Sequence, residues 1–212
     1  HKEYRRQRQM CIRDRAEAFK NIPLQNRWIF QSKVPPPLDH VRNAIASNAA
    51  VPEFPFTFSL SKAPKISDDT GGFVQIADSS NFRVATTVAG GLITIRPGAM
   101  RAMHWHPNAD EWQYYLKGTG RMTVFNAGPS ANTADFHPGD IGYVKKGLGH
   151  YIENTGSSDL VVLAVFRAAR YEAVSFSNWL AHSPPEMVAA TFNLDPEVVA
   201  QFPKGRPDMM PE

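Results

Sequence analysis

From Pro52 onward the chain consists of short apolar runs, rich in β-branched and aromatic residues, separated by Gly, Pro, Asn and Asp turns about every ten residues. Strands this closely spaced, without helices between them, predict an all-β domain, an antiparallel sandwich or barrel. The predicted strands are Phe54–Leu60, Phe73–Ile76, Arg83–Val88, Gly91–Arg96, Glu111–Lys117, Gly120–Asn126, Ile141–Lys145, Gly149–Glu153 and Leu160–Phe166.

The tail of the chain changes to a helical pattern. Asp195 is a favourable N-cap and Pro196 suits the first helical position, so we expect a helix to begin there. Near the N-terminus, Pro23 ends a short helix. The segments with helical character are Ala16–Ile22, Leu38–Ala49, Ser175–Ala181, Pro184–Phe192 and Asp195–Phe202.

Residues 16–65 contain many prolines and few strand signals. The run Pro35–Pro37 predicts a stiff, extended segment. We therefore interpret residues 16–65 as an inter-domain linker or arm. Residues 66–212 form the all-β domain with its C-terminal helices.

Composition narrows the class of protein. A chain of 212 residues, 42% hydrophobic and 11% aromatic, suffices for one globular domain with a core. It has no run of about 18 apolar residues, which excludes a transmembrane helix and predicts no membrane partner. A single cysteine excludes an intrachain disulfide framework and any multi-cysteine metal site.

Residues 1–15 hold the excess positive charge of the chain, whose net charge is +3. A basic arm and a targeting segment are two interpretations of such a stretch. A third fits better, because Arg5–Asp14 reads as the in-frame translation of a common sequencing adapter. We interpret residues 1–15 as a non-native scar, with the natural protein beginning near Arg15 or Ala16. The cellular compartment therefore stays open between cytoplasmic and secreted.

Removing this stretch changes the electrostatic picture. It holds six basic and two acidic residues, so the net charge falls from +3 to −1 without it, and the only cysteine, Cys11, is lost as well. The near-neutral remainder gives no support to a nucleic-acid partner.

His104 and His106 carry the strongest chemical signal. Residues at i and i+2 of a strand share a face, so both imidazoles can bind one point. A turn through Pro107 and Asn108 brings back Glu111, and a second Gly-rich segment supplies His150. Three imidazoles and one carboxylate predict a site for Mn, Fe, Ni or Zn, with open positions if the metal is six-coordinate. The other histidines of residues 16–212 are predicted to be surface, turn or cap residues: His40, His137 and His182.

Two motifs around these residues resemble those of the cupin family. They are Gly98-x5-His104-x-His106-x4-Glu111-x6-Gly118, which matches the first cupin motif completely, and Gly139-x5-Lys145-x-Gly147-x2-His150-x3-Asn154, which matches the second. Only Lys145 departs from the pattern, because the family usually has Pro there. The resemblance implies a cupin double-stranded β-helix, a jelly-roll barrel, with short C-terminal helices and an N-terminal extended arm.

The neighbouring residues, His104–Tyr115 and Gly149–Gly156, look like the C-terminal half of bicupin oxalate decarboxylases. In that family one chain holds two cupins, each of which binds manganese. The resemblance implies that this chain is the inter-domain linker and second cupin, with Mn(II) as its metal and the N-terminal cupin missing. A weak repeat between Ala16–Pro23 and Pro196–Pro203 agrees with this interpretation. Family trimers, stacked as hexamers, imply a homo-oligomer.

The resemblance also implies a reaction. Oxalate, a small dicarboxylate, would be cleaved to formate and carbon dioxide, with dioxygen required but not consumed. The family has an arginine at the position of Arg101 that pairs with the substrate carboxylate. Arg101 lies three residues before His104, on the opposite strand parity, so it reaches the site only if a bulge or a strand end redirects it.

A proton donor is the weak point of this interpretation. The family's second cupin often has a Glu fourteen residues after the last histidine ligand, where this chain has Ala164. The main donor is a Glu on a mobile lid of the first cupin. Glu172 lies in the corresponding loop of this chain and is our candidate acid. Without a positioned acid, protonation of the intermediate is slow, so we expect weak decarboxylase activity from this chain alone.

Two other functions stay open. Ala164 favours a non-catalytic cupin half that binds metal for stability and assembly, whereas Arg101 and the complete ligand set favour chemistry. An oxalate oxidase-like activity would use a similar metal set. It would yield carbon dioxide and peroxide in place of formate.

Overall fold

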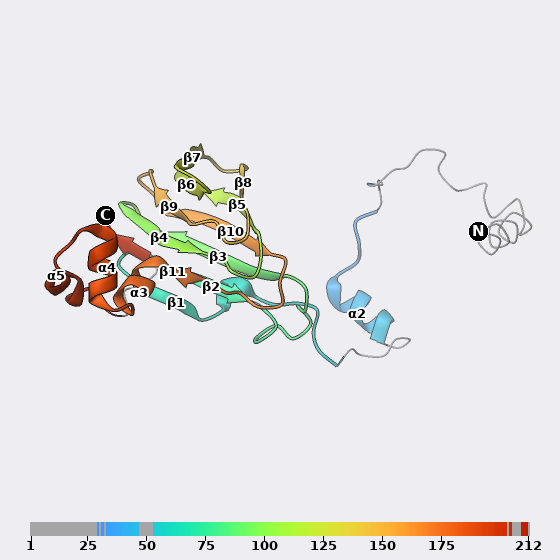
Figure 1. Ribbon diagram of the computed structural model, residues 1–212. Helices are drawn as coiled ribbons and strands as arrows, with labels where there is room; N and C mark the ends of the chain where they lie inside the picture. Colours follow the sequence, from blue (N-terminus) through green and yellow to red (C-terminus); the bar gives the residue numbers. More distant parts are fainter. Residues whose placement is uncertain are drawn as a thin grey trace, which may run out of the picture. The chain divides into compact units, whose positions relative to one another are not determined.

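The computed structural model describes residues 29, 31, 33–46, 53–202, 204 and 209–211 (Figure 1). The chain divides into two units, residues 1–51 and 52–212. In the first unit, helix α2 (Leu38–Ala46) confirms the predicted helical turns. The predicted scar, the helix Ala16–Ile22 and the repeat at Ala16–Pro23 lie outside the described residues. Among the described residues, no helix is long and apolar enough to span a membrane.

Two antiparallel sheets build the second unit. The first, sheet A, has the strand order β1-β2-β3-β10-β5-β8, and the second, sheet B, has the order β11-β4-β9-β6-β7 with β12 paired to β4. Because consecutive strands repeatedly change sheet, the predicted all-β jelly roll is confirmed. The bounds are β1 (Lys65–Asp69), β2 (Gly72–Ala77), β3 (Ala89–Ile95), β4 (Ala99–Trp105), β5 (Glu111–Lys117), β6 (Gly120–Asn126), β7 (Ser130–Phe136), β8 (Ile141–Val144), β9 (His150–Asn154), β10 (Leu160–Phe166), β11 (Val174–Ser175) and β12 (Met209–Pro211).

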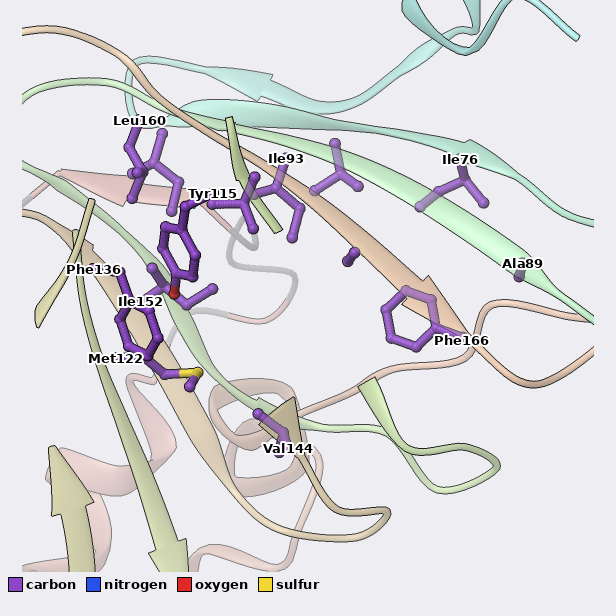
Figure 2. Close-up of a cluster of buried hydrophobic side chains, with 14 of the residues drawn as sticks. Ile76, Ala89, Ile93, Tyr115, Met122, Phe136, Val144, Ile152, Leu160 and Phe166 are labelled. Atoms are coloured by element: carbon purple, nitrogen blue, oxygen red, sulfur yellow. The ribbon is translucent and has the colours of Figure 1, made fainter. Parts of the chain in front are cut away.

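The hydrophobic core lies between the inner faces of the sheets (Figure 2). Tyr115 of β5 stacks on Phe136 of β7 with ring centroids 4.4 Å apart, which joins sheet A to sheet B. Ile95, Ile152 and Leu160 are fully buried. Each such side chain contributes roughly 1.5–3 kcal/mol of hydrophobic free energy.

Two of the predicted strands, Phe54–Leu60 and Arg83–Val88, are wrong, since both segments are loops. Their aromatic residues pack loop against loop: the ring of Phe58 lies 5.4 Å from that of Phe82, and the guanidinium of Arg83 lies 4.5 Å from the ring of Phe54. A composition typical of strands here serves contacts between loops. The other predicted strands are present, within two residues at either end.

The sequences of β1 and β7 have no apolar pattern, so neither strand was predicted. Both lie at the edges of their sheets, and six of the seven residues of β7 are exposed. An edge strand with little buried surface has little need of apolar residues, so its composition resembles that of a loop.

The packing also bears on the start of the domain. Nε2 of Gln75 donates to the carbonyl oxygens of Ser61 and Ala63 at 2.9 and 2.8 Å, beside the 3-10 helix η2 (Leu60–Lys62). These bonds attach the segment around Ser61 and Ala63 to β2, and residues 53–65 fall in the second unit. The part that residues 16–65 play as an inter-domain linker stays a prediction.

Three short helices follow β11: α3 (Phe176–Ala181), α4 (Pro185–Phe192) and α5 (Pro196–Ala200). The predicted cap of the last helix is confirmed, because the carboxylate of Asp195 accepts from the backbone N–H of Glu197 at 2.8 Å and Pro196 is the first helical residue. Ser175 caps α3 in the same way through Asn178.

A pair of glycine variants tests the turn that closes the first motif. Gly118 has φ +78°, and a Cβ there would lie 2.6 Å from the carbonyl oxygen of Asp159; Gly128 has φ +81° with nothing within 4 Å. Gly128→Ala should therefore carry only the conformational cost, about 1–2 kcal/mol. We expect Gly118→Ala to lose a further ~1–3 kcal/mol of unfolding free energy in urea denaturation, because the new methyl group meets backbone. Equal losses would contradict this.

Candidate metal centre

The structure brings together the four residues predicted as metal ligands. His104 lies near the end of β4, His106 just beyond it, Glu111 at the start of β5 and His150 at the start of β9. The ligand atoms of these residues all lie within 4.8 Å of one another. None of the four residues is more than 3% exposed, so the group is closed in by the two sheets.

Strand register explains why distant positions meet. His104 is the Cα partner of His150 across β4 and β9, and their ring centroids are 4.2 Å apart. Glu111 belongs to sheet A, and its carboxylate oxygen Oε2 lies 2.9 Å from Nε2 of His150 and 3.3 Å from Nε2 of His106. The centre therefore spans the space between the sheets.

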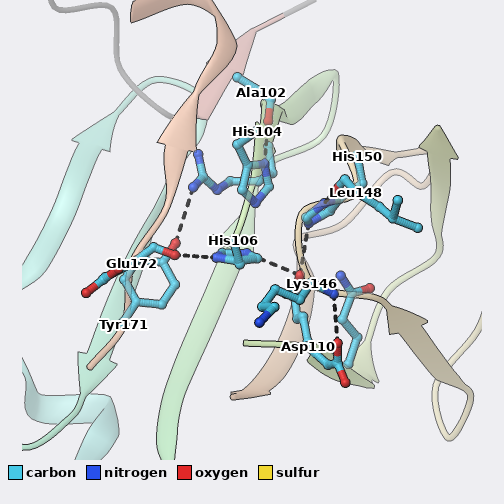
Figure 3. A network of polar contacts seen from close by, with 12 residues as sticks. Ala102, His104, His106, Asp110, Lys146, Leu148, His150, Tyr171 and Glu172 are labelled. Atoms are coloured by element: carbon cyan, nitrogen blue, oxygen red, sulfur yellow. Dashed lines mark hydrogen bonds and ion pairs between the residues drawn. The ribbon is translucent and has the colours of Figure 1, made fainter. Parts of the chain in front are cut away.

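Backbone carbonyls fix the orientation of all three imidazoles (Figure 3). Nδ1–H of His104 donates to the carbonyl of Ala102 at 2.7 Å, and Nδ1–H of His150 donates to that of Leu148 at 3.1 Å. Nδ1–H of His106 donates to the carbonyl of Glu172 at 2.6 Å. Because a carbonyl only accepts, Nδ1 carries the proton and each Nε2 keeps a lone pair. This arrangement is typical of histidines that bind a metal.

Electrostatics favour the charge states that a metal needs. Burial acts to raise the pKa of Glu111, whereas a proton on Nε2 of His106 or of His150 holds that pKa well below its usual range. When both rings are neutral and protonated on Nδ1, a cation has to take over this part. Burial, together with the Arg101 guanidinium, holds the pKa of His104 well below its usual value. An ionised carboxylate beside a neutral imidazole is ready to coordinate a cation without releasing protons.

The unsatisfied atoms agree with a cation between the side chains. Nε2 of His106, Nε2 of His150 and Oε2 of Glu111 are buried and have no hydrogen-bond partner among the described residues. Leaving buried polar atoms unpaired costs about 1–3 kcal/mol each. A divalent ion would satisfy all three, so these residues fit a metal.

Loops around the centre are tied to one another. Asp110 accepts from the backbone N–H of Lys146 through Oδ1 and from the hydroxyl of Tyr143 through Oδ2, each at 2.7 Å. The backbone N–H of Gly147 donates to the carbonyl of His106 at 2.9 Å. These bonds link the loop after β4 to the loop before β9, and so they hold the ligand-bearing segments in register.

Asn154, the last residue of the second motif, has a structural role. Its Nδ2 donates to the carbonyls of Ile95 and Ser158 at 2.8 and 2.9 Å, and its Oδ1 accepts from the N–H of Gly156. The side chain joins the end of β9 to β3, across the two sheets.

Arg101 reaches the interior through an irregularity in β4. The pairing of β4 with β9 shifts register between Arg101 and His104, and both Arg101 and the adjacent Ala102 are buried. The bulge reverses the strand parity that would otherwise direct Arg101 outward. Arg101 is 1% exposed, and its Nη2 donates to the hydroxyl of Tyr171 at 3.3 Å. A fixed positive charge thus lies beside the ligand group.

The two positions predicted to supply an acid give different results. The side chain of Glu172 is exposed and points away from His106 (Figure 3); only the backbone carbonyl of Glu172 contacts the centre. Ala164 is fully buried on β10, on the inner face that also holds Phe166. The acid role of Glu172 stays a prediction. The structure does not bring its carboxylate to the ligands.

Tyr171 was missed by the sequence reasoning. Its ring lies 5.5 Å from that of His106 and 5.2 Å from that of Phe166, and its hydroxyl accepts from Arg101. A lone tyrosine in a loop, far from both motifs along the chain, gave no spacing signal. Its place depends on where β10 ends.

The other histidines lie away from the ligand group, as expected. His182 is the C-cap of α3, where Nδ1–H donates to the carbonyl of Asn178 at 2.8 Å. His137 is exposed in the turn before β8 and lies 3.6 Å from Asp140, and His40 is exposed on α2.

Comparison with known proteins places this geometry in context. The family model described as Cupin matches residues 58–200. The chain is 44% identical over 180 residues to oxalate decarboxylase of Bacillus subtilis, which covers 84% of this chain and 46% of that protein. It is 43% identical over 151 residues to a probable oxalate decarboxylase of Arthroderma benhamiae, which covers 70% of this chain and 37% of that protein.

Solved structures give the same result. A structure from a study of the Mn(II) centres in the Bacillus subtilis enzyme superposes with a TM-score of 0.80 at 39% identity, over 92% of this chain and 51% of the other. A structure from a study of substrate binding in oxalate decarboxylase has a TM-score of 0.80 at 40% identity, over the same shares of each chain. The chain spans about half the length of the relatives it matches.

Replacement of the carboxylate tests the metal centre. We expect Glu111→Gln to weaken Mn(II) binding by more than about 100-fold, because loss of a residue that only supports a ligand already costs about 10–100-fold. Glu153→Gln is the control, since Glu153 alternates with the buried residues of β9 and points to the other face. Free Mn(II), measured by electron paramagnetic resonance during titration, gives both affinities. Equal affinities for the two variants would contradict the assignment.

Proposed function

The chain belongs to the cupin family, and from this membership we propose that it is the metal-binding second cupin of an oxalate decarboxylase. In this proposal its metal is Mn(II), its substrate is oxalate and the reaction requires dioxygen. Similarity to enzymes of that name, two of which it matches at 44% and 43% identity, supports the proposal. Because these relatives are about twice as long, we propose that it works beside another cupin domain and within a homo-oligomer.

The buried guanidinium of Arg101 is the observation that carries this proposal. A structural metal site has no need of an arginine that is 1% exposed beside the ligands. The guanidinium of Arg101 contacts the hydroxyl of Tyr171 and places a positive charge near His104. A carboxylate substrate bound next to the metal would lie beside this charge, and Arg101 would orient it through charge-assisted hydrogen bonds.

The reaction separates the two carbons of oxalate. Hydrogen oxalate gives formate and carbon dioxide: the C–C bond breaks, its electron pair stays on the carbon that becomes formate, and that carbon takes the proton. A bound manganese ion would supply Lewis-acid and redox chemistry at the oxalate oxygens. Arg101 would stabilise the charge that develops on the substrate carboxylate. A proton must then arrive at carbon from a positioned acid.

Among the described residues, no buried carboxyl group lies at the ligand group apart from the ligand Glu111. Among the residues whose burial is described, the buried carboxyl groups are those of Glu111 and Asp78. Glu111 is ionised and committed to the ligand set. Ala164 stands at the position where the resembling family's second cupin often has a Glu, so we propose that the chain binds metal and oxalate but converts oxalate slowly.

A structural, non-catalytic cupin half is the second candidate. The outward side chain of Glu172 and the methyl group of Ala164 favour it. Oxalate binding separates the two functions, because a structural site has no use for oxalate. Detection of peroxide in place of formate would indicate an oxidase-like outcome.

Substitution of Arg101 tests substrate binding. Arg101→Lys keeps the charge but loses the planar, two-pronged donor. We expect it to weaken oxalate binding to the Mn(II)-loaded chain by roughly 10–100-fold, the equivalent of losing hydrogen bonds to a charged group. Oxalate-dependent changes in the Mn(II) spectrum measure this affinity. Arg121→Lys is the control, because Arg121 pairs with Asp135 at the surface. An unaltered affinity in Arg101→Lys would exclude the assigned role.

Restoring an acid tests the cause of slow turnover. Ala164 is fully buried on the inner face of β10, and its Cα partners are Gln113 and Gly91. We expect Ala164→Glu to raise formate production by at least about tenfold, since a positioned general acid contributes about 10²–10⁴-fold. Ala164→Gln, equal in size but unable to deliver a proton, should give no gain. Rapid formate production by the unmodified chain would show that another group supplies the proton.

A further inference from the structure

One short loop carries several of the contacts that orient the metal centre. After β10, residues 169–172 run past the ligand group. The hydroxyl of Tyr171 accepts from Arg101, and the carbonyl of Glu172 accepts from Nδ1–H of His106. The carbonyl of Arg170 accepts from Nδ2 of Asn108 at 2.8 Å. The orientation of a ligand and of the arginine therefore depends on where this loop lies.

Asp78 holds this loop through its backbone and through Arg170. It directly follows β2 and is 4% exposed. Its Oδ2 accepts from the backbone N–H of Tyr171 at 3.1 Å and lies 3.4 Å from Nε of Arg170. Its Oδ1 accepts from the N–H of Ser80 at 2.8 Å and from the hydroxyl of the same residue. One carboxylate thus joins the turn after β2 to the loop after β10.

The ionised state of Asp78 agrees with its role in joining the two loops. Burial acts to raise its pKa, but hydrogen bonds from Ser80 and Tyr171, with the charge of Arg170, hold the pKa below its usual value. Asp78 is ionised, so all of its acceptor sites serve the two loops. A neighbouring bond from the N–H of Ser79 to the carbonyl of Ala169 at 2.8 Å runs beside it.

We propose that Asp78 is a positioning residue for the metal centre. By fixing the backbone of Tyr171, Asp78 sets both the hydroxyl that receives Arg101 and the next carbonyl, which fixes the ring of His106. It touches neither metal nor substrate. The part that concerns Arg101 rests on the proposed function, whereas the part that concerns His106 rests on the metal centre alone.

Asp78→Asn is the variant that tests this. The amide keeps the size of the side chain but turns one acceptor oxygen into a donor, which then faces an N–H group of Ser80 or Tyr171. Ser80→Ala is the matched control: it removes a hydrogen bond from Oδ1 of the same carboxylate and leaves the bonds to the loop intact. Both variants perturb the turn, but only Asp78→Asn disturbs the loop.

Two measurements separate positioning from general stability. In the metal-free chain, nuclear magnetic resonance measures solvent exchange of Nδ1–H of His106 and of the backbone N–H of Tyr171. We expect Asp78→Asn to speed both by at least tenfold, and to weaken Mn(II) binding by about tenfold, as loss of a group that orients a ligand typically does. Ser80→Ala should change neither, even where its thermal stability falls equally.

A double-mutant cycle tests the part of the proposal that concerns Arg101. Tyr171→Phe removes the hydroxyl that Arg101 contacts. Asp78→Asn should weaken oxalate binding in the natural background and have no further effect with Tyr171→Phe, because both changes act on one contact. If oxalate fails to alter the Mn(II) spectrum of the unmodified chain, the proposed function fails, and the exchange of His106 still decides the positioning role.

Three results would overturn the proposal. One is unchanged exchange and Mn(II) affinity in a folded Asp78→Asn chain, and another is equal effects from Ser80→Ala. If Asp78→Asn does not fold, Arg170→Ala replaces it, because that side chain is 58% exposed and its loss leaves the turn intact. Arg170→Ala should speed exchange at Tyr171 by about twofold, the worth of a weak ion pair. Unchanged exchange of the Tyr171 N–H in the Arg170→Ala chain is the third result that would overturn the proposal.

Discussion

The buried carboxylate of Glu111 is the constraint on which the rest of the site depends. A charge that is 1% exposed is strongly unfavourable in a protein interior unless an opposite charge compensates for it. The imidazoles next to Glu111 present lone pairs, because backbone carbonyls take their Nδ1 protons, so they do not compensate by donating protons. A cation between these side chains resolves the conflict. The jelly roll therefore encloses a site that is complete only with a metal.

Closing such a site requires that segments distant in sequence be held to a fraction of an ångström. Asp110 ties the two motif loops together, Asn154 joins the sheets at one end, and Tyr171 with Asp78 holds the loop after β10. The side chains of Asp110, Asn154 and Asp78 bond to backbone groups. Such contacts fix where the chain runs, and the ligands then follow from the strands that carry them.

The metal ligands could be predicted from sequence because the spacing of His104, His106 and Glu111 translates directly into strand geometry. The edge strand β7 could not be predicted from the sequence, because its exposed residues have no apolar pattern. Strand parity alone directs Arg101 outward, and only the bulge before His104 brings it inward. Tyr171 and Asp78 are out of reach for a different reason. Their partners lie 70 and 93 residues away along the chain, and no local rule connects them.

In the proposed function, binding and proton delivery make separate demands on this fold. Ligation and the contact with Arg101 are built from β4, β5 and β9, which are paired through both sheets. An acid must reach the substrate carbon from β10 or from the loop after it. There Ala164 presents a methyl group, and the side chain of Glu172 faces solvent. Neither of these two side chains is a metal ligand or orients one, since only the backbone carbonyl of Glu172 contacts His106. In the proposed function, an acid can therefore be absent from both positions while the metal ligands keep their places.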